Sequence, residues 1–370
     1  MARRVVIDAT PLLSTPYGIG RLTRMMIQSL VSIGCEYELV LFGRRLQGGR
    51  LRDLEYGLKT VHLRLPRAGE WLMKQTRLVE LLCRGDLYHA TDFYLPLGKP
   101  EHAVATIHDL IFLVQPEPTV DHARLAAWVP DFARQCRRII AVSNSSKNDI
   151  VEHLGIDPGK IDVVYSGVDR GVFSPAAKPE ELRRRVAALL GFDRPFFLSV
   201  SCSVGRKNTP FLLDVYETLS QDSPRNDLVL VWDPPTAIRK RYLGGPAKGR
   251  IHFVGNQTDA RLADLYRAST ALIYPSLYEG FGLPVLEAMS CGTPVISSNT
   301  SSLPEVGGAA AVYIDPTDER ELLRALQAFE NDDLASAGLQ GQCLAQAARF
   351  SWDRCARQTV DVYRRCLAGD

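Results

Sequence analysis

The chain of 370 residues is too long for one compact core, and its 46% hydrophobic and 23% charged residues are the balance of a folded globular protein, so we expect two domains. The formal net charge of +2 is too small for a general nucleic-acid binder, although residues 1–185 carry 26 basic against 21 acidic side chains. The eight cysteines are isolated in the sequence, which predicts free thiols. We find neither an apolar run of the ~20 residues that a membrane span needs nor a leader peptide, so we expect a cytoplasmic protein.

The first half of the chain alternates short apolar runs with polar loops and helical patterns. An amphipathic helix is expected over about Arg21–Ile33. This order predicts a parallel sheet covered by helices, and apolar runs without alternation predict strands buried on both faces. The expected strands are Arg4–Asp8, Glu38–Phe42, Leu87–Ala90, Ala103–Ile107 and Ile139–Val142.

The same rhythm begins again after residues 167–179, which are rich in proline and glycine. A helix is expected over Glu180–Leu190, and another over Ser351–Cys366 with a serine N-cap. The fold class is therefore α/β, with two Rossmann-like, doubly wound domains that face each other across a cleft and a border between residues 178 and 179. The strands expected in this half are Phe196–Val200, Leu228–Trp232, Ile251–Val254, Ala271–Tyr274, Pro294–Ser297 and Val312–Ile314.

The densest chemical signal follows the strand that ends at Tyr274. The loop and helix start Glu279-Gly280-Phe281-Gly282-Leu283-Pro284 supplies glycines for close backbone approach and a helix N-terminus for an anion. Glu287 lies eight residues after Glu279, one turn into the helix, and carboxylates accept from vicinal sugar hydroxyls. The alternative is a structural turn with solvated glutamates. We favour a binding site for a nucleotide sugar.

This stretch resembles the Glu-x7-Glu signature of family 4 retaining glycosyltransferases, which have the GT-B fold. The resemblance covers most of the chain and is closest to the bacterial O-antigen mannosyltransferase branch. It implies an acceptor domain, residues 1–178, a nucleotide-sugar domain, residues 179–350, and a last helix, residues 351–370, that packs back on the first. Further matching segments are Gly18–Arg21, Thr106–Leu110, Val142–Ser146, Tyr165–Asp169, Ser302–Val306 and Asp315-Pro316.

The resemblance also assigns groups to the leaving phosphate. Arg206 and Lys207, followed by Asn208, come after the first strand of the second half, where relatives bind the donor diphosphate. Fixed cations there stabilise the charge that grows on the departing phosphate. Many relatives carry a further arginine at this strand end, and the run Ser201–Gly205 lacks it. The alternative for the basic pair is a solvated turn.

Three first-half features have weaker signals. His108 follows a strand and, by resemblance, faces the donor sugar and the leaving phosphate, whereas a lone histidine there is otherwise a packing residue. The Gly18-x-Gly20 loop could approach the sugar phosphate or the acceptor, or be a plain turn. His89, Thr91 and Asp92 are candidates for the acceptor cleft.

A possible membrane contact is the segment Glu70–Leu82, which has helical spacing and basic residues nearby. The alternative, which we favour, is a core-facing helix with a solvated basic face. The basic residues are Arg44, Arg45, Arg50, Arg52, Arg64 and Arg67.

By this resemblance we expect a retaining hexosyltransferase that moves mannose, with GDP-mannose as the favoured donor, to a lipid-linked saccharide at the inner face of the cell membrane. Neither a metal, for which an Asp-x-Asp dyad is absent, nor another cofactor nor a protein nucleophile is expected. The alternatives are an epimerase or hydrolase of nucleotide sugars, an inactive binding protein, and a transferase that uses a UDP-sugar and a soluble acceptor. The lack of a Gly-x-Gly-x-x-Gly motif disfavours an oxidoreductase.

Overall fold

The computed structural model describes residues 3–13, 18–44, 57–64, 70–93, 95–116, 119–201, 205–331 and 338–368. The chain divides into two compact units, each treated by itself below. Unit 1 comprises Met1–Gly167 and Ser351–Asp370, and unit 2 comprises Val168–Phe350. The border expected between residues 178 and 179 lies within unit 2, where helix α7 (Pro179–Leu190) begins.

Unit 1 contains a seven-stranded parallel sheet in the order β3-β2-β1-β4-β5-β6-β7. The five expected strands are present. Two more, β3 and β7, were not predicted, because β3 is a half-buried edge strand of mixed polarity and β7 has only three residues. The strands are β1 (Arg4–Asp8), β2 (Glu38–Arg44), β3 (Lys59–Leu63), β4 (Leu87–Ala90), β5 (Ala103–Ile107), β6 (Arg138–Ala141) and β7 (Ile161–Val163).

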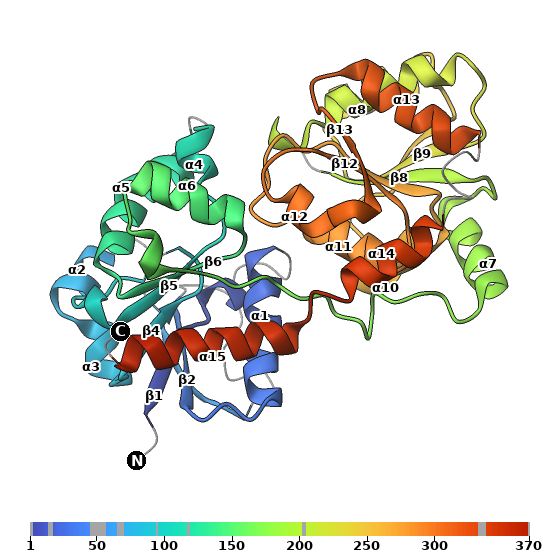
Figure 1. Ribbon diagram of the computed structural model, residues 1–370. Helices are drawn as coiled ribbons and strands as arrows, with labels where there is room; N and C mark the ends of the chain where they lie inside the picture. The colour runs from blue at the N-terminus through green and yellow to red at the C-terminus, as the bar shows by residue number, and fades with distance from the viewer. Residues whose placement is uncertain are drawn as a thin grey trace. The chain divides into compact units, whose positions relative to one another are not determined.

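Helices cover both faces of this sheet. On one face α1 packs against α15 (Figure 1). Met26 and Ile27 share a core there with Val362 and Tyr363. On the other face lie α5 and α6, as the fully buried strands require. The helices are α1 (Ile19–Ser32), α2 (Glu70–Gln75), α3 (Leu78–Cys83), α4 (Ile111–Val114), α5 (Val120–Gln135), α6 (Asn144–Leu154) and α15 (Trp352–Ala368).

His89 does not line a surface, and the expectation that it helps to form an acceptor cleft is wrong. Its ring is completely buried between β4 and α15, where Nδ1 lies 2.7 Å from the Tyr363 hydroxyl and Nε2 lies 2.7 Å from Thr106 Oγ1. Burial lowers the pKa of His89 to about 3. The neutral imidazole therefore ties the last helix to the sheet.

Unit 2 repeats the architecture with a six-stranded parallel sheet in the order β10-β9-β8-β11-β12-β13. All six expected strands are present, with ends that agree to within about one residue, as the usual uncertainty of element boundaries allows. They are β8 (Phe196–Val200), β9 (Asp227–Val231), β10 (Ile251–Phe253), β11 (Ala271–Tyr274), β12 (Val295–Ser298) and β13 (Ala311–Ile314).

The core of unit 2 lies where α8 and α13 cover one face of its sheet, with Leu212, Tyr216 and Phe329 fully buried. The two sheets confirm the α/β fold class. The helices of this unit are α7 (Pro179–Leu190), α8 (Thr209–Ser220), α9 (Thr236–Leu243), α10 (Asp259–Ala268), α11 (Leu283–Ser290), α12 (Leu303–Gly307), α13 (Glu319–Glu330) and α14 (Leu339–Ala347). Across the described parts of both units, no helix has the length and apolarity to cross a membrane.

The strand orders fix where ligands bind in such sheets. In unit 2 the order of the strands reverses between β8 and β11, so the loops after these two neighbours leave in opposite directions. In unit 1 the same reversal falls between β1 and β4. The carboxyl ends of strands at such a switch point form the usual ligand crevice of an open α/β sheet.

Candidate functional site

The loop after β11 turns directly into helix α11. Gly282, which precedes the helix, has φ 103°, and a Cβ there would lie 2.7 Å from Leu303 Cδ2. Only glycine therefore fits this position. Pro284 stands in the first turn, which confirms the predicted helix start. The first N–H groups of α11 and its positive dipole end are thereby fixed beside the loop Glu279–Phe281.

The loop after β8 brings the predicted basic pair to the same place. Arg206 and Lys207 lie in a 3-10 turn, and Asn208, with φ 54°, begins α8. The Arg206 carbonyl accepts from the Leu277 N–H at 2.8 Å, and Asn208 Nδ2 donates to the Pro316 carbonyl at 2.7 Å. One backbone hydrogen bond therefore joins the two loops at the switch point, and the Asn208 side chain joins the first of them to the loop after β13.

Glu279 is paired with both cations. Its Oε2 lies 2.7 Å from Arg206 Nη1, and its Oε1 lies 2.7 Å from Lys207 Nζ. Burial alone would raise the pKa of Glu279, but Lys207 and then Arg206 outweigh it and hold the pKa below its ordinary value. Two cations and one carboxylate leave a net positive charge, which suits a ligand phosphate.

Glu287 has a different environment. It lies in the second turn of α11, is 3% exposed, and its Oε2 accepts from the Tyr266 hydroxyl at 3.2 Å. The two glutamates thus border one loop–helix junction. Glu279 is held by cations and Glu287 by a neutral phenol.

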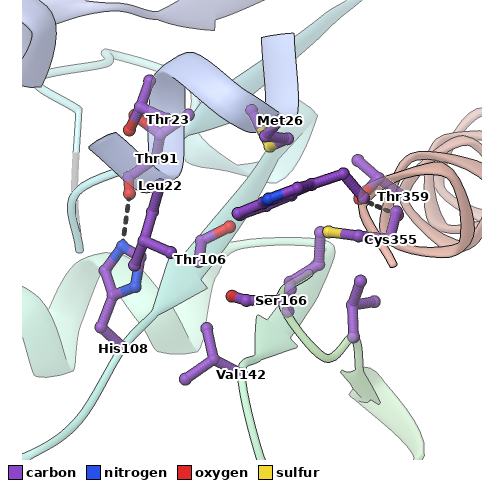
Figure 2. A pocket seen from close by; sticks show the side chains of 13 residues that line it. Leu22, Thr23, Met26, Thr91, Thr106, His108, Val142, Ser166, Cys355 and Thr359 are labelled. Carbon is purple, nitrogen blue, oxygen red and sulfur yellow. Dashed lines mark hydrogen bonds between the residues drawn. The ribbon is translucent and has the colours of Figure 1, made fainter. Parts of the chain in front are cut away.

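His108 lies in unit 1 and lines a small pocket with Thr23, Thr91, Thr106 and Ser166 (Figure 2). Its Nε2 lies 2.8 Å from the Thr91 carbonyl, which can only accept, so Nε2 carries the proton. Burial lowers the pKa of His108, and its buried Nδ1 has no partner among the described residues. The ring therefore offers a hydrogen-bond acceptor to a hydroxyl group.

The Gly18-x-Gly20 segment is partly different from the prediction. Gly18, with φ 57°, is the N-cap of α1, but Gly20 lies inside the first turn of the helix rather than in the loop before it. The helix starts two residues earlier than expected, since Ile19 and Gly20 already belong to it. Only Gly18 has a conformation that requires glycine.

The structure thus brings together most predicted site residues in unit 2, whereas His108, Gly18 and Gly20 belong to unit 1. Tyr274, Tyr266 and Thr23 are neighbours of these groups that the sequence did not predict. Tyr274 was visible as the last residue of the strand before the loop, but nothing in the spacing showed its contacts. In the described parts of the chain, no three acidic, histidine or cysteine side chains are grouped as metal ligands.

The segment expected as one helix is two short ones, α2 and α3, because Arg77 between them has φ 51°. Our favoured prediction of a core-facing helix is only partly right. Met73, Val79 and Cys83 are buried, but the exposed fractions are 63% for Trp71, 58% for Leu72, 62% for Leu81 and 44% for Leu82. Arg45, Arg50, Arg52 and Arg67, part of the expected basic face, lie outside the described residues.

The chain matches two families of known proteins. Residues 16–172 match the family described as "Glycosyltransferase Family 4", and residues 184–343 match "Glycosyl transferases group 1". Each match coincides with most of one structural unit.

Individual proteins resemble the chain over most of its length. The O-antigen chain mannosyltransferase B of Escherichia coli is 34% identical over 302 residues, which are 75% of this chain and 74% of that protein. The serotype-specific mannosyltransferase WbdA of Escherichia coli is 28% identical over 277 residues, which are 72% of this chain and 34% of that protein. A solved structure, Anabaena HepE in complex with UDP and glucose, covers 98% of this chain and 100% of its own, with a TM-score of 0.77 and 19% identity.

Proposed function

We propose that this chain, which belongs to the retaining family 4 glycosyltransferases of the GT-B fold, transfers a mannosyl group from a nucleoside-diphosphate sugar to a saccharide acceptor during synthesis of a surface polysaccharide. The observation that carries the proposal is the cluster of Arg206, Lys207 and Glu279 beside the N-terminus of α11. The named relatives support mannose as the sugar.

In this proposal the cluster stabilises the leaving group. As the bond from the sugar to the diphosphate breaks, negative charge grows on the phosphate, and Lys207, Arg206 and the N–H groups of α11 stabilise that charge. Glu279 limits the excess positive charge and accepts from hydroxyls of the sugar, while Glu287 accepts from the ribose. The departing phosphate takes the proton of the acceptor hydroxyl, so the protein supplies neither a nucleophile nor a metal.

The two units then have different partners. Unit 2 binds the nucleotide sugar, since it holds every charged group of the cluster. Unit 1 binds the acceptor and supplies His108, whose Nδ1 has no partner among the described residues and accepts from a sugar hydroxyl. Asn208 and the backbone from Gly280 to Leu283 line the nucleotide site.

Donor choice is tested directly by transfer assays. We expect GDP-mannose, and not the UDP-sugars, to raise the melting temperature and to give a glycosylated product with retained anomeric configuration. A lipid-linked saccharide and a soluble saccharide are supplied as acceptors, and product is followed by mass spectrometry. Stabilisation by UDP-sugars alone would contradict the mannosyl donor but not the transferase, whereas free sugar or an epimerised donor without acceptor product would favour a hydrolase or an epimerase.

We also propose that the protein works at the inner face of the cell membrane, where it contacts anionic lipid through α2 and α3. The exposed Trp71, Leu72, Leu81 and Leu82 can enter the headgroup region, and Lys74, Arg77 and Arg84 in the same segment suit anionic headgroups.

Vesicle co-sedimentation checks this contact. We expect binding to vesicles with anionic lipid that weakens as salt rises, because exposed charges are screened beyond ~8 Å at physiological ionic strength. Replacing Trp71 and Leu72 by serine should reduce the bound fraction several-fold. Val120→Ser, which changes an 86% exposed apolar residue on α5, is the matched control. Equal binding of both variants would place the contact elsewhere, and no salt-sensitive binding at all would favour a soluble acceptor.

A further inference from the structure

Two buried tyrosines lie directly behind the charged groups of the proposed donor site. We infer that Tyr274 and Tyr266 are positioning residues, Tyr274 for Lys207 and Tyr266 for Glu287. The inference rests on the proposed function, because these tyrosines would orient groups that bind the donor without contacting nucleotide or sugar themselves.

Tyr274 is the last residue of β11 and is 1% exposed. Its hydroxyl accepts from Lys207 Nζ and donates to Glu279 Oε1 at 3.1 Å. The direction is fixed, since burial and the charge of Glu279 raise the pKa of Tyr274 and a deprotonated carboxylate can only accept. The phenol proton therefore goes to Glu279, and the oxygen lone pairs face the ammonium.

This arrangement controls where the Lys207 ammonium lies. Burial alone would lower its pKa, but Tyr274 and Glu279 outweigh burial and raise it, so the group stays charged. Of its three N–H donors, one goes to Tyr274 and one to Glu279 at 2.7 Å. The third has no acceptor among the residues that the structure describes and is left for a phosphate oxygen. Without the phenol oxygen the flexible lysine has Glu279 as its remaining hydrogen-bond acceptor in the cluster, and it would lose this orientation.

Tyr266 does the same for the second glutamate. It lies on α10, is fully buried, and donates from its hydroxyl to Glu287 Oε2 at 3.2 Å. Its position is fixed in turn, because its carbonyl accepts from Thr293 Oγ1 at 2.6 Å and its ring meets Phe173 edge to face at 6.1 Å. Burial keeps the pKa of Tyr266 well above its ordinary value, so the phenol stays a donor.

Tyrosine-to-phenylalanine variants test the inference, because they remove one oxygen and keep the packed ring. We expect Tyr274→Phe to lower kcat about tenfold with little change in nucleotide affinity. We expect Tyr266→Phe to weaken binding of GDP, or of UDP if the wild type binds that nucleotide, by about tenfold with kcat nearly unchanged at saturating donor. Tyr216→Phe is the matched control, since Tyr216 is fully buried in the same unit and its hydroxyl donates to the Asn226 carbonyl at 2.7 Å, away from the charged cluster.

Double-mutant cycles separate positioning from general packing. If Tyr266 acts through Glu287, adding Tyr266→Phe to Glu287→Ala should not weaken nucleotide binding further, and Tyr274→Phe should not slow Lys207→Ala further. Additive losses, or equal losses of kcat and affinity in all three single variants, would overturn the inference. A wild-type protein that binds nucleotide but transfers no sugar would contradict the proposed function instead. The Tyr266 cycle would then still test the role of Tyr266, because it is measured by nucleotide affinity alone.

Discussion

Lys207→Ala should reduce kcat for sugar transfer by about 10²–10³-fold while the protein remains folded. The reason is that the contact from the ammonium strengthens as charge develops on the leaving phosphate, so its loss affects the transition state more than the bound donor. Glu279 keeps its ion pair with Arg206 at 2.7 Å, so the variant leaves no unpaired buried carboxylate. Steady-state kinetics at saturating donor and acceptor measure the effect.

The matched control for this variant is Lys248→Ala, which removes an exposed lysine from the same unit. It should leave kcat within a factor of about two, as surface substitutions usually do. Lys207→Arg keeps the charge but changes a point charge into a planar fork, and we expect an intermediate rate. A normal kcat for Lys207→Ala would contradict the whole donor-site proposal.

The fold could be predicted largely because its strands are buried on both faces. A strand such as Ala103–Ile107 is apolar apart from Thr106 and lies between polar loops, and its complete burial in the sheet is what makes this composition necessary. The strand Lys59–Leu63 was not predicted for the opposite reason, since an edge strand with half-buried residues has no continuous run of apolar residues. The helix break at Arg77 could not be predicted, because a left-handed backbone conformation at one residue does not change the spacing of the apolar residues.

The candidate site also has a part that the sequence predicts and a part that it does not. The loop with Gly282 and Pro284 could be predicted, because backbone conformation restricts which residues fit there. The contacts of Tyr274 and Tyr266 could not be predicted from the sequence, because they join side chains that come from different elements and meet only in the folded unit. His89 shows the limit most clearly, since a histidine at a strand end has the same sequence signal whether it faces a ligand or the last helix.

Glu287→Ala should have its main effect on nucleotide affinity rather than on rate. The change removes a buried carboxylate expected to accept from the ribose hydroxyls, a contact whose loss costs about 1–3 kcal/mol, or roughly 5- to 150-fold in Kd. Because the ribose is remote from the breaking bond, its contact is the same in the ground and transition states, and kcat at saturating donor should change little. Titration calorimetry with GDP measures the affinity.

Two further variants make the Glu287 result specific. Glu319→Ala removes an exposed glutamate from α13 in the same unit and should bind nucleotide as the wild type does. Glu287→Gln keeps one acceptor oxygen but replaces the other with an NH2 group that only donates, so its affinity should fall between those of the wild type and the alanine variant. If nucleotide affinity were unchanged in Glu287→Ala, the ribose assignment would be wrong. If instead kcat fell as steeply as in Lys207→Ala, Glu287 would belong with the groups that stabilise the leaving phosphate, since only a contact strengthened in the transition state lowers kcat in this way.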